Sequence, residues 1–250
     1  MTVTSGPGPV AGFGAAGPAV ELVGVEKAFA TPAGPRPVLA GVDLAIEPGE
    51  VVAVAGRSGS GKTTLLTIVV GWERADVGSV ALLGATPTAT SPWADLAIVP
   101  QTLGLLDELT VAENVGLPLR LGAFGGVDRA GDPLADPAEV MAWLGVDHLG
   151  GRYPTEVSLG EQQRAALARA VVARPQVLVA DEPIAHQNQA WAEATMAVVA
   201  DLAARGTACL LATHNPVAFA TARRVLDLRD GRLVPHVPHV PHVPHVPPAG

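Results

Sequence analysis

The stretch that decides the fold is GRSGSGKT, residues 56–63. It follows the apolar run VVAVA at 51–55 and precedes TLLTIVV, which continues as a predicted helix. The pattern G-x-x-x-x-G-K-[ST] between a strand and a helix is typical of a phosphate-binding loop. Its glycines let backbone N–H groups turn toward phosphate oxygens, and the helix directs its positive end at the same anion. The predicted nucleotide contacts are Gly56, Arg57, Ser58, Gly59, Ser60, Gly61, Lys62, Thr63 and Thr64.

Within this loop, two side chains have distinct predicted tasks. Lys62 can reach the β- and γ-phosphates of a nucleotide, and Thr63 can bind Mg²⁺ through its hydroxyl. The alternative is an ordinary Gly/Ser turn. The preceding strand, the spacing and both side chains favour the phosphate loop, and the chain has only two lysines, Lys27 and Lys62.

A pair of carboxylates ends a second apolar run, VLVADEP at 177–183. Asp181 at the strand tip can hold Mg²⁺, and Glu182 can act as general base toward an attacking water. Pro183 stops the strand. Adjacent carboxylates at a strand end are usually only solvated, but a phosphate loop in the same chain favours the metal site.

Short apolar runs separated by helical segments set the fold class. They lie at 51–55, 96–99, 177–180, 208–212 and 225–228 and predict a parallel sheet covered on both faces. Two further strands are predicted near the start, at 20–29 and 38–50. Residues 102–164 break this rhythm and predict a mostly helical insert between two strands.

Composition excludes several classes of function. The 250-residue chain is 48% apolar, enough to bury a core, and its net charge of −8 argues against nucleic acid as a partner. The single cysteine, Cys209, lies in an apolar run and is predicted to be a core residue in a reducing compartment. We find no apolar run of about 18 residues and no basic N-terminal secretion signal, so we expect a cytoplasmic protein.

Both ends of the chain have biased composition. Residues 1–19 are rich in Gly, Pro and Ala and are predicted to be disordered. Residues 235–250 carry the repeat PHVPHVPHVPHVPP, which favours an extended polyproline II tail. That form would place successive repeat histidines about 9 Å apart on one face, which favours a solvated tail over loose metal capture. These histidines are His236, His239, His242 and His245.

Taken together, the motifs of residues 20–234 resemble those of the nucleotide-binding subunit of ABC transporters. In that family a glutamine follows a strand before the helical insert, as Gln101 does here, and a histidine ends the next core strand, as His214 does. A signature stands about 20 residues before the acidic pair; here Glu161 is 20 positions before Asp181. Phe29 is the candidate for stacking on adenine, with core packing as the alternative.

The resemblance implies a P-loop NTPase (RecA-like) α/β core with a mixed, mainly parallel sheet, an antiparallel β edge and an inserted α-helical subdomain. It implies ATP and Mg²⁺ as cofactors. Glu182, His214 and Gln101 would be catalytic, with His214 on the γ-phosphate, and Thr63, Gln101 and Asp181 would hold the metal.

The resemblance also implies partners. The active unit would be a head-to-tail homodimer in which Ser158, Gly160 and Glu161 of one copy face the γ-phosphate bound by the other. A separate membrane permease would be driven from the inner face of the membrane. The segment LLDELTVAENVGLPL, residues 105–119, is most like the lipoprotein-release and macrolide-exporter subfamily, which implies export.

Two departures from the family pattern leave alternatives open. The signature LSGGQ is VSLGE here, with Leu159 in place of a glycine, and Asn188 stands where an aspartate usually crosses the dimer interface. We expect Leu159 to strain the backbone or crowd the phosphate and to slow hydrolysis. The alternatives are an ATP-dependent clamp with little turnover, or a soluble ABC ATPase that acts on DNA or ribosomes.

Overall fold

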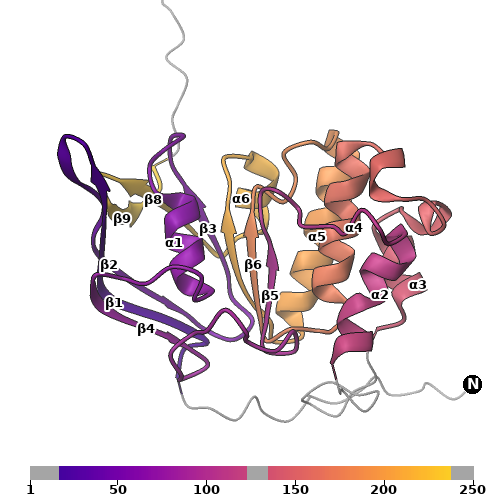
Figure 1. Cartoon of the computed structure of the whole chain (residues 1–250), viewed down its shortest axis with the longest axis horizontal. Coiled ribbons are helices and arrows are strands. Elements are labelled where there is room, and N and C mark those ends of the chain that lie inside the picture. The colour runs from indigo at the N-terminus through magenta and orange to yellow at the C-terminus, as the bar shows by residue number, and fades with distance from the viewer. Residues whose placement is uncertain (1–16, 123–134, 238–250) are drawn as a thin grey trace, which may run out of the picture.

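The computed structural model of the chain describes residues 17–122 and 135–237. Over these ranges the chain forms two β-sheets with helices packed against them (Figure 1). The strands are β1 (Val20–Thr31), β2 (Gly34–Ile46), β3 (Val51–Ala55), β4 (Val77–Leu82), β5 (Leu96–Val99), β6 (Val177–Asp181), β7 (Ala208–Ala212), β8 (Arg224–Arg229) and β9 (Arg232–Pro235). The helices are α1 (Lys62–Val69), α2 (Val111–Leu121), α3 (Pro137–Trp143), α4 (Leu159–Val171), α5 (Gln189–Ala204) and α6 (Pro216–Thr221), with 3₁₀ turns η1 (Asp147–Leu149) and η2 (Pro154–Glu156).

The larger sheet has the strand order β5-β6-β7-β3-β8-β9. Strands β5 to β8 are parallel, and β9 pairs antiparallel with β8 at the edge. Every residue of β3, β6 and β7 is buried, as short strands covered on both faces require. The five predicted core runs all lie in this sheet. Because the carboxyl ends of β3, β5, β6 and β7 share one edge, the segments that follow them emerge side by side.

Two apolar cores lie on opposite faces of this sheet. Leu178 and Ala180 of β6 point into one core, with α2 to α5, whereas Val177 and Val179 point into the other, with α1 and the smaller sheet. Cys209 is fully buried in the first core, and burial raises the pKa of its thiol to about 12. Its prediction as a core residue is therefore confirmed.

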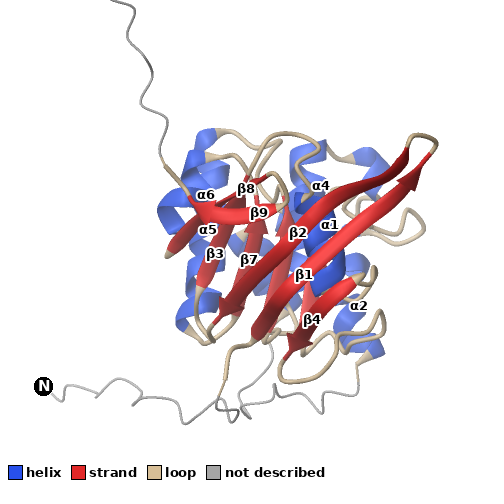
Figure 2. Cartoon of the chain, turned by 90° about the vertical axis from the view of Figure 1, so that its left-hand side faces the viewer, coloured by secondary structure: helices blue, strands red, loops and turns tan. Residues whose placement is uncertain are grey.

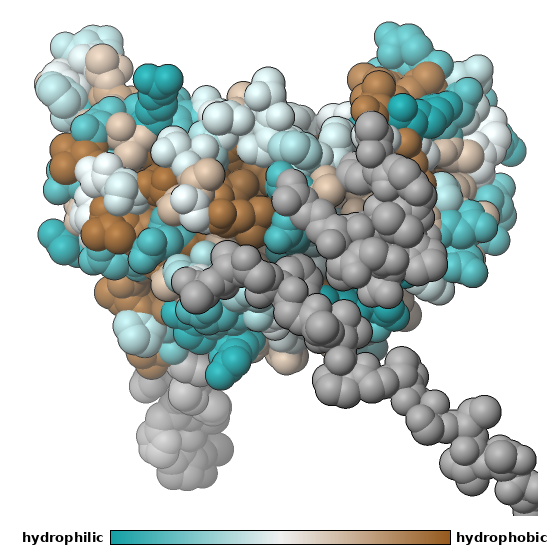
Figure 3. Space-filling view, turned by 90° about the horizontal axis from the view of Figure 1, so that it is seen from below, coloured by the Kyte–Doolittle hydropathy of each residue, from teal (hydrophilic) through white to brown (hydrophobic). Residues whose placement is uncertain are grey.

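The smaller sheet is antiparallel, in the order β2-β1-β4, and its long β1–β2 hairpin crosses one side of the molecule (Figure 2). The sequence predicts β1 and β2 but not β4. Apolar side chains that remain exposed here and after α1 include Val23, Trp72 and Val77. The view from below shows apolar surface on the left-hand side, where these elements lie (Figure 3).

The chain between β5 and β6 carries α2, α3 and α4. The predicted insert boundary at residue 164 falls inside α4, which continues to Val171 and packs its second half on the sheet. Among the described residues, we find no helix that is long and apolar enough to cross a bilayer.

The structure differs from the prediction at both ends of the folded domain. Ala19 is buried, and its N–H donates to the carbonyl of Ile46 at 2.8 Å, so the fold begins before residue 20. At the other end, Pro235 belongs to β9. His236 Nδ1 lies 2.9 Å from Asp227 Oδ1, so the first repeat histidine is not in a solvated tail, because the pairing of β9 with β8 brings it there. Residues 1–16 and 238–250, with His239, His242 and His245, lie outside the described ranges.

Candidate nucleotide-binding site

The segments that follow β3, β5, β6 and β7 border a cavity of about 760 Å³, together with the β1–β2 hairpin and the start of α4. It is lined by Phe29, Arg36, Val38, Gly56, Arg57, Ser58, Gly59, Gly61, Lys62, Thr63, Thr64, Gln101, Leu103, Leu159, Gln163, Asp181, Glu182, Ala185, His186 and His214. Most of the residues that the sequence predicts for the site therefore meet in one place. Ser60, Ser158, Gly160 and Glu161 are predicted site residues outside this lining.

The phosphate loop requires its glycines for conformation and for space. Gly61, at the N-cap of α1, has φ 106°, and a Cβ there would lie 2.7 Å from a methyl group of Val38. A Cβ on Gly56 would lie 2.6 Å from Ser60 Oγ. The Lys62 ammonium donates to the carbonyl of Gly56 at 2.8 Å and reaches that of Arg57 at 3.4 Å, so it is held within the loop.

Two observations show that this loop fits a nucleotide phosphate. The Ser60 hydroxyl oxygen is buried without a hydrogen-bond partner, and a buried polar atom without a partner is costly. At Gly59 no heavy atom lies within 4 Å of the position that a Cβ would take, so this part of the loop is open. For a metal ion, the Thr63 hydroxyl and the Asp181 carboxylate are hard oxygen donors of the kind Mg²⁺ prefers. They lie together, since Thr63 Oγ1 donates to Asp181 Oδ2 at 2.7 Å.

The two neighbouring carboxylates are in different environments. Burial raises the pKa of Asp181 above its usual range, although the hydrogen bond from Thr63 opposes that shift. Glu182 has a positive φ of 50°, a backbone conformation that costs a non-glycine residue about 1–3 kcal/mol. Its Oε2 accepts from Thr213 Oγ1 at 3.0 Å, and its Oε1 lies 2.8 Å from His214 Nδ1. The strained backbone thus directs the Glu182 carboxylate toward His214.

Gln101 and Phe29 lie at the sides of the cavity. Gln101 is exposed at the end of β5. Phe29 is 40% exposed on β1 and pairs in register with Arg36 of β2. The Lys27 ammonium lies 5.3 Å from the Phe29 ring centroid, and it is bound by Glu73 at 2.8 Å and by Asp76 at 3.1 Å. An exposed ring that lines the cavity supports stacking over core packing.

The start of α4 is a complete capping box. Ser158 Oγ accepts from the Glu161 N–H, and Glu161 Oε2 accepts from the Ser158 N–H at 2.8 Å and its hydroxyl at 2.7 Å. The Ser158 hydroxyl therefore lowers the pKa of Glu161. Gly160 packs so tightly that a Cβ would lie 2.6 Å from the carbonyl oxygen of His186.

The expectation of backbone strain at Leu159 is wrong. Leu159 is not among the described residues with positive φ, because it follows the N-cap Ser158 as the first residue of α4. Its side chain is 48% exposed and lines the cavity, so crowding is the remaining effect. Asn188 caps α5, since its Oδ1 accepts from the Trp191 N–H at 3.0 Å.

Sequence reasoning missed several residues of the lining. His186 lies in the loop after the acidic pair, and Gln163 lies one turn into α4. Gln163 lies two residues after the signature VSLGE, and His186 lies two residues before Asn188, so closeness to these motifs was the available signal.

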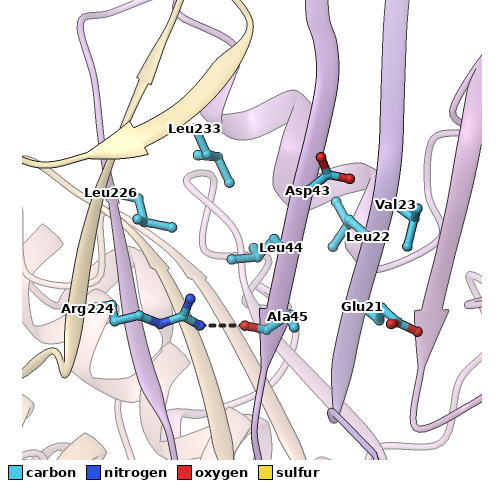
Figure 4. A pocket seen from close by; sticks show the side chains of 9 residues that line it. All are labelled: Glu21, Leu22, Val23, Asp43, Leu44, Ala45, Arg224, Leu226 and Leu233. Atoms are coloured by element: carbon cyan, nitrogen blue, oxygen red, sulfur yellow. Dashed lines mark hydrogen bonds between the residues drawn. The ribbon is translucent and has the colours of Figure 1, made fainter.

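A second, smaller hollow of about 350 Å³ lies between the two sheets (Figure 4). It is lined by Glu21, Leu22, Val23, Asp43, Leu44, Ala45, Arg224, Leu226 and Leu233. Arg224, its one basic group, is bound by the carbonyl of Ala45 and, at 2.6 Å, by Glu50 Oε1. None of the residues predicted for the nucleotide site lines this hollow, so the chemistry belongs to the larger cavity.

A phosphate loop at the carboxyl edge of a parallel sheet, with carboxylates on the neighbouring strand, defines a P-loop NTPase. Residues 39–185 match the family model for ABC transporters. The lipoprotein-releasing system ATP-binding protein LolD 2 of Caulobacter vibrioides is 39% identical over 224 residues, 86% of this chain and 96% of that protein. The chain belongs to the ABC transporter family. It is an ATP-binding subunit of the type of the lipoprotein-releasing and macrolide-export proteins, and it is an ATPase.

Other relatives match over less of their length. The macrolide export ATP-binding/permease protein MacB of Escherichia coli (strain K12) is 34% identical over 87% of this chain, which is 34% of that protein. An iron(III) import ATP-binding protein, FbpC 2 of Rhodococcus jostii, is 38% identical over 86% of this chain and 61% of that protein.

Solved structures agree with the fold. A dimeric structure of MJ0796, a bacterial ABC transporter cassette, has a TM-score of 0.75 and 27% identity over 86% of this chain and 96% of that chain. A dimeric post-hydrolysis state of the same cassette, bound to ADP and Pi, has a TM-score of 0.76. The α/β P-loop NTPase prediction and the ATPase prediction are therefore confirmed.

Proposed function

We propose that this ATPase binds MgATP in the 760 Å³ cavity and hydrolyses it with Glu182 as general base, in a homodimer that drives a separate membrane permease. The observation that carries the proposal is the convergence of three groups on one cavity. These are the Lys62 loop, the Thr63–Asp181 pair and the Glu182–His214 pair.

Each group has a distinct task. Loop amides and Lys62 bind the β- and γ-phosphates, and Phe29 stacks on the adenine. Thr63, Asp181 and Gln101 would hold Mg²⁺, which supplies charge neutralisation between the phosphates. Glu182 accepts a proton from the water that attacks the γ-phosphorus, and the bond from that phosphorus to the bridging oxygen of ADP breaks. His214 contacts the γ-phosphate and orients Glu182.

Dimerisation and partners rest on the relatives. The cassette MJ0796 is described as dimeric, and Leu159 at the start of α4 faces the same cavity as the phosphate loop. In the proposed dimer, Ser158 and the amides near Gly160 and Glu161 contact the γ-phosphate held by the second copy. The names of LolD 2 and MacB support an exporter that works at the inner face of the membrane, whereas the import relative supports the opposite direction.

The test of hydrolysis compares ATP turnover of the native chain with Glu182→Gln and with Glu139→Gln, an exposed glutamate on α3. We expect Glu182→Gln to lose about 10²–10⁴-fold in kcat, the usual contribution of a general base, while ATP binding persists. Glu139→Gln should match the native rate. Equal rates in the native chain and Glu182→Gln would refute the assignment.

The same variant tests dimerisation. Glu182→Gln with ATP and Mg²⁺ should double in mass by light scattering, and Lys62→Ala should remain a monomer.

An ATP-dependent clamp with little turnover is the second candidate, favoured by Leu159 and Asn188 at the interface loops. It predicts a native chain that dimerises on ATP without measurable phosphate release. Isolation from native membranes with a multi-span protein supports the transport role, whereas recovery with ribosomes or DNA contradicts it.

A further inference from the structure

Gln163 lies one turn into α4 and is 3% exposed. We call the loop from Glu182 to Asn188, between β6 and α5, the catalytic loop. The side-chain amide of Gln163 contacts this loop of the same chain at three points. Nε2 donates to the carbonyl of Glu182 at 2.6 Å, while Oε1 accepts from the His186 N–H and from Gln187 Nε2, both at 3.3 Å. One buried amide therefore spans the segment from the acidic pair to the start of α5.

The contact with Glu182 lies on a strained backbone. A non-glycine residue with positive φ persists only where its surroundings fix it. The Glu182 N–H donates to the carbonyl of Ala212 at 2.8 Å, and its own carbonyl accepts from Gln163 and, at 3.3 Å, from the Ala185 N–H. Gln163 is the side chain that holds this peptide from α4, and the peptide conformation sets the direction of the Glu182 carboxylate.

A second contact fixes the same loop to the first turn of α4. The carbonyl of His186 sits where a side chain at Gly160 would be, and the His186 N–H is bound by Gln163. The loop is therefore held against α4 through both backbone groups of one residue, His186. A shift of α4 at its first turn moves the loop with it, because packed contacts of this kind transmit displacement.

We infer that Gln163 is a positioning residue for ATP hydrolysis: it holds the peptide of Glu182 and couples the start of α4 to the general base of the same chain. This rests on the proposed role of Glu182. In the proposed dimer the start of α4 contacts the nucleotide of the second copy. Gln163 then links the occupancy of one site to the geometry of the other.

The chain offers a matched control at the adjacent position. Gln162 Nε2 donates to the carbonyls of Pro154 at 2.9 Å and Val157 at 3.2 Å, so its bonds stay next to η2 and outside the catalytic loop. Gln163→Met and Gln162→Met each remove one amide from the same turn and keep a helix-forming side chain of similar length. A second variant, Gln163→Glu, keeps an acceptor for the His186 N–H but loses the donor to Glu182.

The experiment measures kcat, the KM for ATP and the thermal midpoint of the full chain. We expect Gln163→Met and Gln163→Glu to lose about tenfold or more in kcat with KM within about twofold, while Gln162→Met keeps both. A fall in kcat at constant KM is the loss of an interaction used only in the transition state. The inference is overturned if the two Gln163 variants stay within twofold of the native kcat, or if Gln162→Met falls equally.

A double-variant cycle separates this inference from the assignment of Glu182. If Gln163 acts through Glu182, Gln163→Met should lower the single-turnover rate little further in the Glu182→Gln background. A further tenfold loss there shows that Gln163 acts elsewhere and overturns the inference. If Glu182→Gln instead hydrolyses ATP at the native rate, Glu182 is not the general base, and the proposed function is refuted as well.

Discussion

At the scale of single residues, the acidic pair places two adjacent carboxylates in different surroundings. Asp181 is 6% exposed at the end of β6 and accepts a hydrogen bond from Thr63. Glu182 turns away through its positive φ and faces His214. Burial raises the pKa of Asp181, so its ionised form destabilises the fold when no cation is bound.

Removing the Asp181 charge should therefore stabilise the nucleotide-free chain while abolishing Mg²⁺-dependent turnover. When folding raises the pKa of a carboxyl, that group contributes fully to the stability of the fold below its pKa in the unfolded chain, 3.8. The contribution is lost as the pH rises through its pKa in the folded chain. Asp181→Asn should raise the thermal midpoint at pH 7, since the variant no longer carries a buried charge. The difference should vanish as pH falls toward 3.8.

The control for that variant is Asp201→Asn, at an exposed i,i+4 pair with Arg205 on α5. Such a pair contributes less than about 1 kcal/mol, so its midpoint should barely change. A lower midpoint for Asp181→Asn at pH 7 would contradict the cost of the buried carboxylate.

Leu159 gives a second prediction at this scale, because its backbone is helical and its side chain lines the cavity. If crowding alone limits the site, Leu159→Ala should raise ATP turnover as much as Leu159→Gly, within about twofold. Only the glycine variant should lose stability, by up to about 1 kcal/mol. Parallel turnover assays and urea unfolding measure both; a gain confined to the glycine variant would show that backbone freedom matters.

At the scale of elements, two helices begin with the same capping box. Ser158 and Glu161 form it on α4, and Thr110 and Glu113 form it on α2. In both boxes the threonine or serine lowers the pKa of the glutamate by hydrogen bonding. Each box is therefore complete above the usual glutamate pKa of 4.5 and is lost as pH falls through the lowered value.

Comparing variants of these two capping boxes separates the effect of a cap on the stability of the fold from its effect on ATP turnover. Ser158→Ala and Thr110→Ala should each cost about 1 kcal/mol in urea unfolding, the usual loss of an N-cap. Ser158→Ala should also lower ATP turnover, since the proposal places its hydroxyl on the γ-phosphate, whereas Thr110→Ala should not. Equal effects of both variants on turnover would place Ser158 outside the chemistry.

The sequence predicts the buried parallel strands because each is a short apolar run with no polar alternation. It does not predict β4, whose first three residues are exposed and whose Gly78 packs against the backbone of Gly24. That strand forms through pairing with β1, a long-range contact. For β9 the sequence contains a local signal, the pair Asp230 and Gly231 between two apolar runs. In the structure both residues have positive φ and form the turn between β8 and β9.

The site residues likewise include some that the sequence predicts and some that it does not. Motif spacing identifies groups that line the cavity, such as Lys62 and Glu182. Gln163 binds backbone carbonyl and amide groups 19 and 23 residues away, and no spacing rule describes a backbone partner so distant along the chain. The conformation of Leu159 likewise depends on where α4 begins, which the Ser158–Glu161 box sets.

At the scale of the whole molecule, the cavity joins three parts of the fold. Phe29 comes from the smaller sheet, Lys62 from the loop after β3, and Leu159 from α4. A nucleotide bound at the phosphate loop should stabilise the chain, because a ligand that binds only the folded state adds to its stability.

ATP at 100 times its Kd should add about 2.7 kcal/mol and raise the thermal midpoint by about 5–10 °C. Lys62→Ala should abolish this rise, since we propose that its ammonium binds the nucleotide phosphates. Arg152→Ala, an exposed arginine outside the cavity, should preserve it. An undiminished rise in Lys62→Ala would refute the phosphate loop as the binding site.

The scarcity of lysine has a practical consequence for labelling. Lys27 is 9% exposed, and its hydrogen bond with Glu73 raises its pKa, so it is a poor nucleophile. Lys62 is the remaining side-chain amine, and it lines the cavity. An acylating reagent should therefore modify the folded chain chiefly at one lysine, and bound ATP should shield it. The mass of the intact protein then reports how many molecules in a sample were occupied.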